Sequence, residues 1–235
     1  MRATVKEKRE VARGTLLAIF DVGGQEVDFR AGQYFWVELL DPPYEDEKGP
    51  RRHISVVTSP TERGVLGLCT RIRDSAFKRS LAEIEVGAEV EVEEPKGDFK
   101  LPEDTEPHYV FIAGGIGITV FRSMLRYIAD TGDPFNVTLV YSNRDQASTA
   151  FLDELTELES QIPGFELVVT MTGDPEWEGE SRRVDADFLR DKLGELAEYT
   201  YLLAGPPPMV EGVVQQLNEA GVPEAQVLPD RFSGY

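Results

Sequence analysis

Three glycines within four residues form the most distinctive cluster in the sequence. Gly114, Gly115 and Gly117 follow an apolar run and come just before Thr119, where a stretch with helical periodicity begins. A glycine backbone can approach a bound diphosphate closely, and a helix that starts there adds unpaired N–H groups and the positive end of its dipole. Residue 120 is valine, so the spacing is not the dinucleotide fingerprint G-x-G-x-x-G. The cluster indicates a nucleotide site, although a tight strand-to-helix turn without a ligand would need the same residues.

Two further candidate sites follow other apolar runs. Gly205 and Pro206 come directly after the run 200–204, where proline can fix a turn and start a helix without losing a hydrogen bond. A simple helix start would explain this pair equally well. Ser142 and Arg144 end the run that begins at residue 136. They could bind a phosphate such as the 2′-phosphate of NADP, for which arginine is well suited, or Arg144 could be an ordinary surface residue.

A basic cluster, Arg51-Arg52-His53-Ile54-Ser55, opens a predicted strand in the first half of the chain. Arg52 and Ser55 could hold a phosphate or the polar edge of a flat ring, while the backbone between them pairs along that edge. A strand with an exposed basic end is the alternative. His53 and His108 are too few and too far apart to indicate a metal site, and no metal is expected.

The elements that must position these residues fall into two groups. The first hundred residues contain short β-branched and aromatic stretches, and helical spacing predicts one helix over Ala76–Glu83. Such spacing favours an antiparallel barrel or sandwich. The predicted strands cover residues 14–22, 33–40, 53–59, 65–72 and 88–95.

From His108 onward, continuous apolar runs alternate with amphipathic stretches, which is typical of parallel strands covered by helices on both faces. The boundary is expected within the charged, proline-bounded segment 102–107. The predicted fold is therefore an antiparallel Greek-key β-barrel, residues 1–104, followed by a doubly wound α/β domain, residues 105–235. In the second domain the predicted strands are 109–113, 136–141, 165–171 and 200–204, and the predicted helices are 120–129, 150–160, 185–193 and 209–220.

Composition narrows the possible partners. The 235 residues carry a formal net charge of −19, which disfavours binding to nucleic acids and to anionic membranes. No apolar run approaches the ~20 residues of a membrane span, and the amino end is charged, so a cytoplasmic location is expected. The single cysteine, Cys69, fits a strand as a small apolar residue and cannot alone hold an iron-sulfur cluster.

Taken in order along almost the whole chain, the motifs resemble the ferredoxin-NADP(H) reductase superfamily, in particular its bacterial oxygenase-reductase-like members. Each motif is weak individually, and the ordered set carries the resemblance. The motifs are AGQY at 31–34, RHIS at 52–55, SAFK at 75–78, PKGDF at 95–99, AGGIGIT at 113–119, YSNR at 141–144, AGPPPM at 204–209 and RFSGY at 231–235.

The resemblance implies that the barrel binds FAD. Arg52 would contact the flavin diphosphate, and Ser55 would lie near N5 of the flavin ring. The backbone amides of Phe77 and Lys78 would cradle the diphosphate at a helix start, with Lys78 adding charge. The other residues implied at this site are His53, Ile54, Thr70 and Ser75.

The resemblance also implies that the second domain binds NADP or NAD. The nicotinamide nucleotide would lie on the glycine turn and Thr119, while Gly205 and Pro206 shape the nicotinamide slot. Ser142 and Arg144 would favour NADPH, with Arg182 or Arg183 as further candidates. Phe232 and Tyr235 would cover the nicotinamide side of the flavin. The residues expected nearest the reacting rings are Ser55, Thr119 and Tyr235.

Three positions depart from the family pattern. Ile54 replaces the aromatic residue of R-x-Y-S, Ala204 replaces the cysteine often found before Gly-Pro, and Val120 replaces the proline after GGIGIT. The first removes a stacking ring and the second a thiol near the hydride path. The third removes a rigid helix start.

The function implied is an FAD-dependent oxidoreductase that accepts a hydride from NAD(P)H and passes electrons to a separate acceptor, such as a ferredoxin, a small quinone or free flavin. Two alternatives stay open. One is a non-catalytic electron-transfer or regulatory subunit that docks a larger enzyme. The other is a nucleotide-binding module whose flavin site has decayed, which Ile54 and Val120 would fit.

Overall fold

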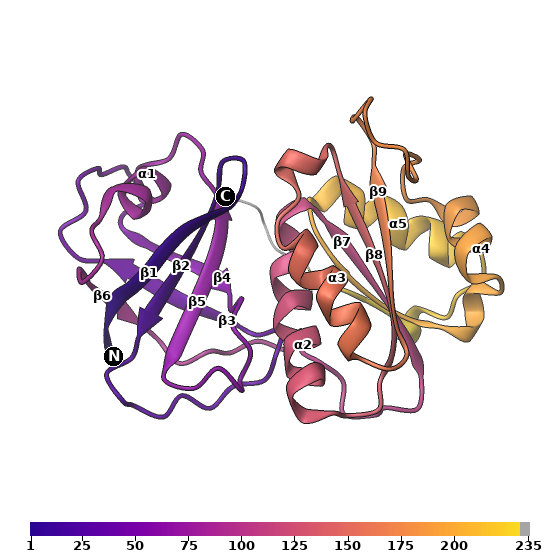
Figure 1. The fold of residues 1–235 in the computed structure, drawn as a ribbon, viewed down its shortest axis with the longest axis horizontal. Helices are drawn as coiled ribbons and strands as arrows, with labels where there is room; N and C mark the ends of the chain where they lie inside the picture. Colours follow the sequence, from indigo (N-terminus) through magenta and orange to yellow (C-terminus); the bar gives the residue numbers. More distant parts are fainter. Residues whose placement is uncertain (231–235) are drawn as a thin grey trace. The chain divides into compact units, whose positions relative to one another are not determined.

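Six antiparallel strands form the first half of the molecule, and the computed structural model describes residues 1–230. In β3, Phe35, Val37 and Leu39 point into the core, while the intervening residues are half-buried. This is the period-two alternation of a sheet with one buried face. The elements are β1 (Arg2–Ala12), β2 (Thr15–Asp21), β3 (Tyr34–Leu39), β4 (Arg51–Ser55), β5 (Val65–Arg71), α1 (Ala76–Glu83) and β6 (Glu89–Val92) (Figure 1).

The six strands close into a barrel. Their hydrogen-bonded order is β4-β3-β6-β1-β2-β5. The backbone N–H of Val57, just beyond β4, donates to the carbonyl oxygen of Gly67 in β5 at 2.9 Å. The N–H of Gly67 donates in turn to Oγ1 of Thr58 at 3.1 Å. These bonds join the two ends of the strand order, and the predicted antiparallel barrel is confirmed.

β1 is a strand that the apolar patterns did not predict. With 11 residues it is the longest strand of this sheet, and it pairs with β2 along one edge and β6 along the other. Only Ala3 and Val5 are buried, while most of the other positions carry exposed charged side chains. Apolar alternation is the signal on which strand prediction depends, so a strand held mainly by backbone hydrogen bonds escapes it.

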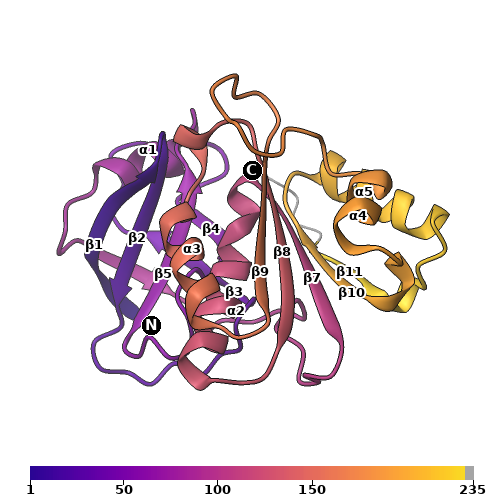
Figure 2. The same cartoon turned by 45° about the vertical axis from the view of Figure 1, so that its right-hand side comes forward.

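Five parallel strands, in the order β11-β10-β7-β8-β9, form the sheet of the second half. Apolar side chains of α4 and α5 pack against Val110, Ile112, Tyr201 and Leu203 of the sheet. Helices α2 and α3 lie on its other face (Figure 2). On that face the ring of Phe121 stacks on that of Phe111. The doubly wound α/β prediction is confirmed. The elements are β7 (His108–Gly114), η1 (Gly115–Gly117), α2 (Ile118–Thr131), β8 (Asn136–Asn143), η2 (Gln146–Ser148), α3 (Leu152–Gln161), β9 (Phe165–Met171), α4 (Ala186–Leu193), η3 (Leu196–Glu198), β10 (Thr200–Ala204), α5 (Pro207–Glu219), η4 (Glu224–Gln226) and β11 (Val227–Pro229).

Local sequence accounts for the helix boundaries. Helix α1 covers the predicted residues, because the Ser75 hydroxyl accepts the N–H of Lys78 as an N-cap. Asp185 caps α4 in the same way. Helix α5 begins at Pro207, two residues before the predicted start, since proline suits the first helical turn. The short β11 was not predicted, because three residues ending in proline give too little pattern.

The outer edges of the parallel sheet are partly covered. On β9, the N–H of Leu167 donates to the carboxylate of Glu159 at 2.6 Å, and the N–H of Met171 donates to the Glu180 carbonyl at 2.9 Å. On the opposite edge, β11 has only three residues and ends at Pro229, which lacks an N–H.

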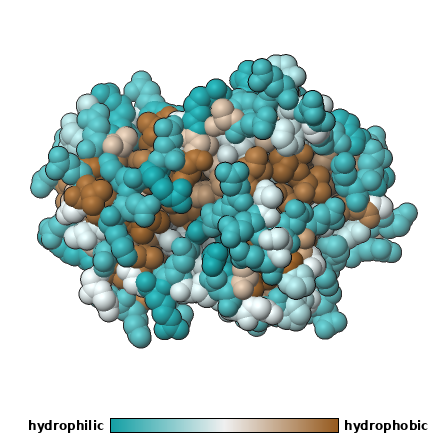
Figure 3. Space-filling model, viewed as in Figure 1, coloured by the Kyte–Doolittle hydropathy of each residue, from teal (hydrophilic) through white to brown (hydrophobic). Residues whose placement is uncertain are grey.

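The chain divides into two compact units. The first contains Met1–Leu101 together with Arg122–Tyr127 of α2, and the second contains Pro102–Phe121 and the chain from Ile128 onward. Hydrophilic side chains cover most of the face seen in Figure 3, with apolar side chains in smaller groups on each unit. Within residues 1–230, no helix is long and apolar enough to cross a membrane.

Candidate functional site

The start of α1 gathers four of the predicted site residues. Ser75 caps the helix, and Phe77 in its first turn is buried. Arg52 is 5% exposed, and its guanidinium lies 5.4 Å from the centre of the Phe77 ring. Lys78 follows directly in the helix. β4 and α1, which are far apart in the sequence, therefore bring Arg52, Ser75, Phe77 and Lys78 to one place.

Positive charge is concentrated at this helix start. Burial lowers the pKa of Lys78, and the positive charges of Arg73 and Arg52 lower it further. Arg73 and Arg52 thus lie close enough to repel the Lys78 ammonium group, in a chain whose net charge is −19. The first N–H groups of the helix point toward the same end, where that of Lys78 donates to the Ser75 hydroxyl and that of Arg79 to the Ser75 carbonyl. Cations clustered at a helix start are typical of anion-binding sites, and Arg73 is one that the sequence analysis did not single out.

A carboxylate of the protein lies at this site. Oδ2 of Asp46, in the loop between β3 and β4, accepts the N–H of Ala76, the first residue of α1, at 3.2 Å. Oδ1 of the same carboxylate lies 3.6 Å from Nη2 of Arg52. Nη1 of Arg52 donates to the carbonyl oxygens of Lys48 at 3.0 Å and Gly49 at 2.8 Å. Asp46 was missed from sequence, since only the fold places it beside residues 52 and 76.

The remaining β4 residues divide between two faces. Ile54 lies opposite the buried Phe35 and packs on the barrel core, on the same face as Arg52. His53 and Ser55 lie on the other face, where the His53 ring lies tilted against those of Trp36 and Tyr34, at centroid distances of 4.9 and 5.4 Å. Burial lowers the pKa of His53. Arg52 and Ser55 therefore do not converge, and a ligand that touched both would have to run along the strand.

Thr70 and Cys69 lie side by side in β5, and both are buried. Thr70 pairs in register with Leu16 of β2. Burial raises the pKa of the Cys69 thiol to about 12, which fits the expected role as a small apolar residue.

In the second unit, the glycines of two turns pack backbone against backbone. A Cβ atom on Gly205 would lie 3.0 Å from Cα of Gly114, and one on Gly117 would overlap the Ala204 carbonyl group. Gly115, between Gly114 and Gly117, has a φ of 53°, in the left-handed region. Gly114, Gly117 and Gly205 are thus needed for chain packing at the carboxyl ends of β7 and β10, whether or not a ligand lies there.

Other predicted residues surround these turns. The buried Thr119 hydroxyl donates to the Ile116 carbonyl at 3.1 Å and so closes the glycine turn. Ser142, near the end of β8, pairs in register with Gly114 at the end of β7. Arg144 is exposed one residue beyond β8. The structure therefore brings the glycine turn and Ser142 to neighbouring positions at the carboxyl edge of the sheet, where open α/β sheets bind ligands.

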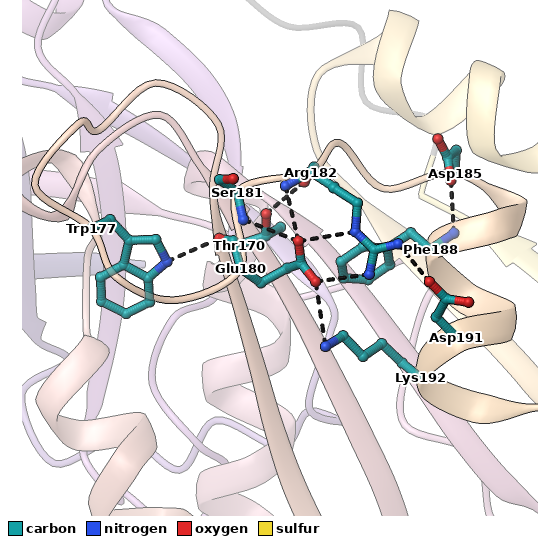
Figure 4. A network of polar contacts seen from close by, with 9 residues as sticks. All are labelled: Thr170, Trp177, Glu180, Ser181, Arg182, Asp185, Phe188, Asp191 and Lys192. Carbon is teal, nitrogen blue, oxygen red and sulfur yellow. Dashed lines mark hydrogen bonds and ion pairs between the residues drawn. The ribbon is translucent and has the colours of Figure 1, made fainter.

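Arg182, a further phosphate candidate, is already engaged. Its guanidinium donates to both carboxylate oxygens of Glu180, at 2.8 and 3.0 Å, and to Asp191 at 2.6 Å (Figure 4). These bonds lower the pKa of Glu180 to about 2, with the Arg182 hydrogen bond as the largest cause. The guanidinium also lies 5.3 Å from the Phe188 ring centre. Each of its three guanidinium nitrogens therefore has a protein acceptor, which counts against a phosphate partner, and the suggestion that Arg182 binds a phosphate stays a prediction.

The sequence reasoning also passed over Asp230, directly after β11. Its N–H donates to the Leu203 carbonyl at 2.7 Å, and its carboxyl is buried, with Oδ2 accepting no hydrogen bond from residues 1–230. Burial raises the pKa of this carboxyl to about 7. Phe232 and Tyr235 lie outside the described residues. Across residues 1–230, no three His, Cys, Asp or Glu side chains are grouped so that they could hold a metal ion.

Comparisons with known proteins match both halves of the chain. The family model described as the oxidoreductase NAD-binding domain matches residues 111–215. The reductase component of propane 2-monooxygenase from Gordonia sp. (strain TY-5) is 28% identical over 215 residues, covering 89% of this chain and 60% of that protein. The chain spans 56–60% of the length of the first curated relatives it matches.

Solved structures share the folds of both units. The Amycolatopsis cytochrome P450 reductase GcoB superimposes with a TM-score of 0.83 at 25% identity, covering 99% of this chain and 70% of that one. The FAD/NAD-binding domain of nitric oxide dioxygenase from Vibrio cholerae has a TM-score of 0.86 at 21% identity, covering 98% of both chains. The second likeness shows the fold alone.

Proposed function

We propose, from the premise that this chain belongs to the ferredoxin-NADP(H) reductase superfamily, that it is an FAD-dependent oxidoreductase that takes a hydride from NAD(P)H and passes electrons to a separate acceptor. The observation that carries the proposal is the anion site at the start of α1, formed by Arg52, Arg73, Lys78 and the helix N–H groups. It lies in the unit where the family holds its flavin.

The residues at this site suit the diphosphate of FAD. The carboxylate of Asp46 already binds the Ala76 N–H and lies near Arg52, so the donors can hold an oxyanion. Arg52 is well suited to bidentate contact with phosphate oxygens, and Lys78 would add a point charge. The face of the Phe77 ring packs against the Arg52 guanidinium. When bound, the flavin would accept two electrons as a hydride and release them singly. We assign residues 1–104 to this flavin domain.

The nicotinamide nucleotide is assigned to residues 105–235. Support comes from the NAD-binding family match over residues 111–215 and from the turns that carry Gly114, Gly117 and Gly205. Thr119 orders the glycine turn through its bond to Ile116, so its part in the reaction is to position the backbone amides. Ser142 and the exposed Arg144 support a preference for NADPH, because a free guanidinium can pair with a 2′-phosphate.

The acceptor is proposed to be a separate electron-carrier protein such as a ferredoxin. The relatives are named as reductase or electron transfer components of oxygenases, which supports this role. A cytoplasmic location and the absence of an iron-sulfur cluster remain predictions from the sequence.

Anaerobic mixing of the FAD-loaded protein with NADH and with NADPH tests the proposal. We expect the yellow flavin absorbance to disappear and to return when an oxidised electron acceptor is added. Protein that binds FAD but is not bleached by either nucleotide would support the electron-transfer or regulatory subunit instead. Protein that remains colourless with added FAD would support the nucleotide-binding module with a decayed flavin site. Either result would contradict the proposal.

A further inference from the structure

The loop between β3 and β4 places the carboxylate of Asp46 where a phosphate would bind. Asp46 contacts both the first N–H of α1 and the Arg52 guanidinium, at 3.2 and 3.6 Å. These are the two kinds of donor that the proposed flavin site offers to a diphosphate. A carboxylate and a phosphate oxygen cannot both accept from the same N–H at full strength. The two anions therefore compete for one position.

Residues 45–49 form a turn within this loop. The contacts around the turn would let it move while the rest of the loop stays in place. Residues 45–48 are exposed, and Gly49, with a φ of 67°, has open space around it. On one side of the turn, Tyr44 is fixed to α1 by hydrogen bonds between its backbone and the Ser80 hydroxyl, at 3.1 and 3.2 Å. On the other side, the Pro50 carbonyl accepts the N–H of Leu39 at 3.0 Å.

Arg52 links the turn to the site. Besides facing Asp46, it donates to the carbonyl oxygens of Lys48 and Gly49, so one buried guanidinium holds the whole turn against the helix start. A diphosphate that drew the guanidinium toward itself would weaken these bonds. Displacement of Asp46 and release of the turn are thus coupled through Arg52.

We propose that Asp46 is an internal occupant of the flavin diphosphate site, which sets flavin affinity because its carboxylate must leave the start of α1 before the diphosphate binds. The inference rests on the proposed function, since that assigns the diphosphate to this site. The neighbouring Glu45 and Glu47 are exposed carboxylates of the same turn and make none of these contacts among residues 1–230.

The test compares Asp46→Asn with Glu45→Gln and Glu47→Gln, which change the net charge equally. FAD binding to the apoprotein is measured by the quenching of flavin fluorescence. Asn can still accept the Ala76 N–H, so this contact with α1 can be kept, but one negative charge beside the diphosphate is gone. We expect Asp46→Asn to bind FAD about tenfold more tightly than wild type, and the two control variants to stay within about twofold. Equal affinity in Asp46→Asn and wild type, or equal tightening in the controls, would overturn the inference.

A second probe separates this inference from the flavin assignment. Inorganic pyrophosphate is titrated while the amide resonances of Ala76 and Phe77 are followed by NMR. Tighter pyrophosphate binding in Asp46→Asn, with no FAD binding in any variant, would support the competing carboxylate while refuting the flavin function. Unchanged pyrophosphate binding in Asp46→Asn would refute the competition whatever the result with FAD.

Discussion

A Cβ atom on Gly117 would lie 2.2 Å from the carbonyl oxygen of Ala204. The neighbouring atoms are backbone, at the end of β10, so they cannot rotate away as a side chain would. We predict that Gly117→Ala lowers the free energy of unfolding by about 3 kcal/mol and weakens nucleotide binding, as measured by urea denaturation and by NADPH titration. Gly212→Ala is the control, because Gly212 lies within α5 with open space around it. That change should stabilise the protein by about 0.5–1 kcal/mol.

Arg144 and Arg182 should differ in their effect on nucleotide choice. Arg144 is exposed beyond β8, whereas the Arg182 guanidinium is bound to Glu180 and Asp191. We predict that Arg144→Ala raises the KM for NADPH by about tenfold or more, because a charge-assisted hydrogen bond to the 2′-phosphate is lost. The KM for NADH should stay nearly unchanged. Arg182→Ala should leave the ratio of the KM for NADPH to the KM for NADH as it is in wild type. Equal effects of Arg144→Ala on both nucleotides would remove the basis for an NADPH preference.

Asp230 should make stability depend on pH. Its pKa in the folded protein is raised to about 7, compared with about 3.9 in an unfolded chain. Between these values the folded state binds more protons than the unfolded state, so the free energy of unfolding should fall as pH rises from about 4 to about 7 and stay level above. Asp230→Asn should remove this decline and be more stable than wild type at pH 8, by no more than about 4 kcal/mol. Parallel profiles of the two proteins in urea denaturation would contradict the prediction.

Lys8, which is far from α1 in the sequence, should stabilise that helix. Its ammonium group donates to the carbonyl oxygens of Ala82 at 2.8 Å and Leu81 at 3.3 Å, and also to that of Ile84, at the end of a helix with no basic residue in its last turn. We predict that Lys8→Met lowers the free energy of unfolding by about 1–2 kcal/mol. Lys6→Met, at an exposed position of the same strand, should have little effect. A Lys8→Met variant as stable as Lys6→Met would show that the contact is dispensable.

Much of the fold could be predicted because its signals are local. Helix α1 was placed correctly, since Ser75 provides a cap and Phe77 and Leu81 recur at helical spacing on its buried face. The parallel strands β9 and β10 were also predicted with the observed bounds, because a strand covered on both faces is a continuous apolar run. β1 was missed for the opposite reason, since its charged side chains face solvent.

The site was harder to predict, because its electrostatics depend on segments that only the fold brings together. Asp46 and Ala76 are 30 residues apart, and nothing in the local sequence links them. Arg182 was named as a phosphate candidate, and its bond to Asp191 could not be predicted, since that residue comes nine positions later on a helix whose orientation the sequence does not specify. The glycine turn was found from its composition. That these glycines are required by backbone packing between two turns became visible only in the structure.

The edges of the parallel sheet also affect how prone this protein is to aggregate at high concentration. An incoming strand from an unfolded neighbour needs free backbone donors, yet two of those on β9 are held by Glu159 and Glu180, and β11 is short and ends in Pro229. Templated growth of this sheet into aggregates is therefore disfavoured from either side. The sheet that we assign to the nucleotide should tolerate high protein concentration without recruiting other chains.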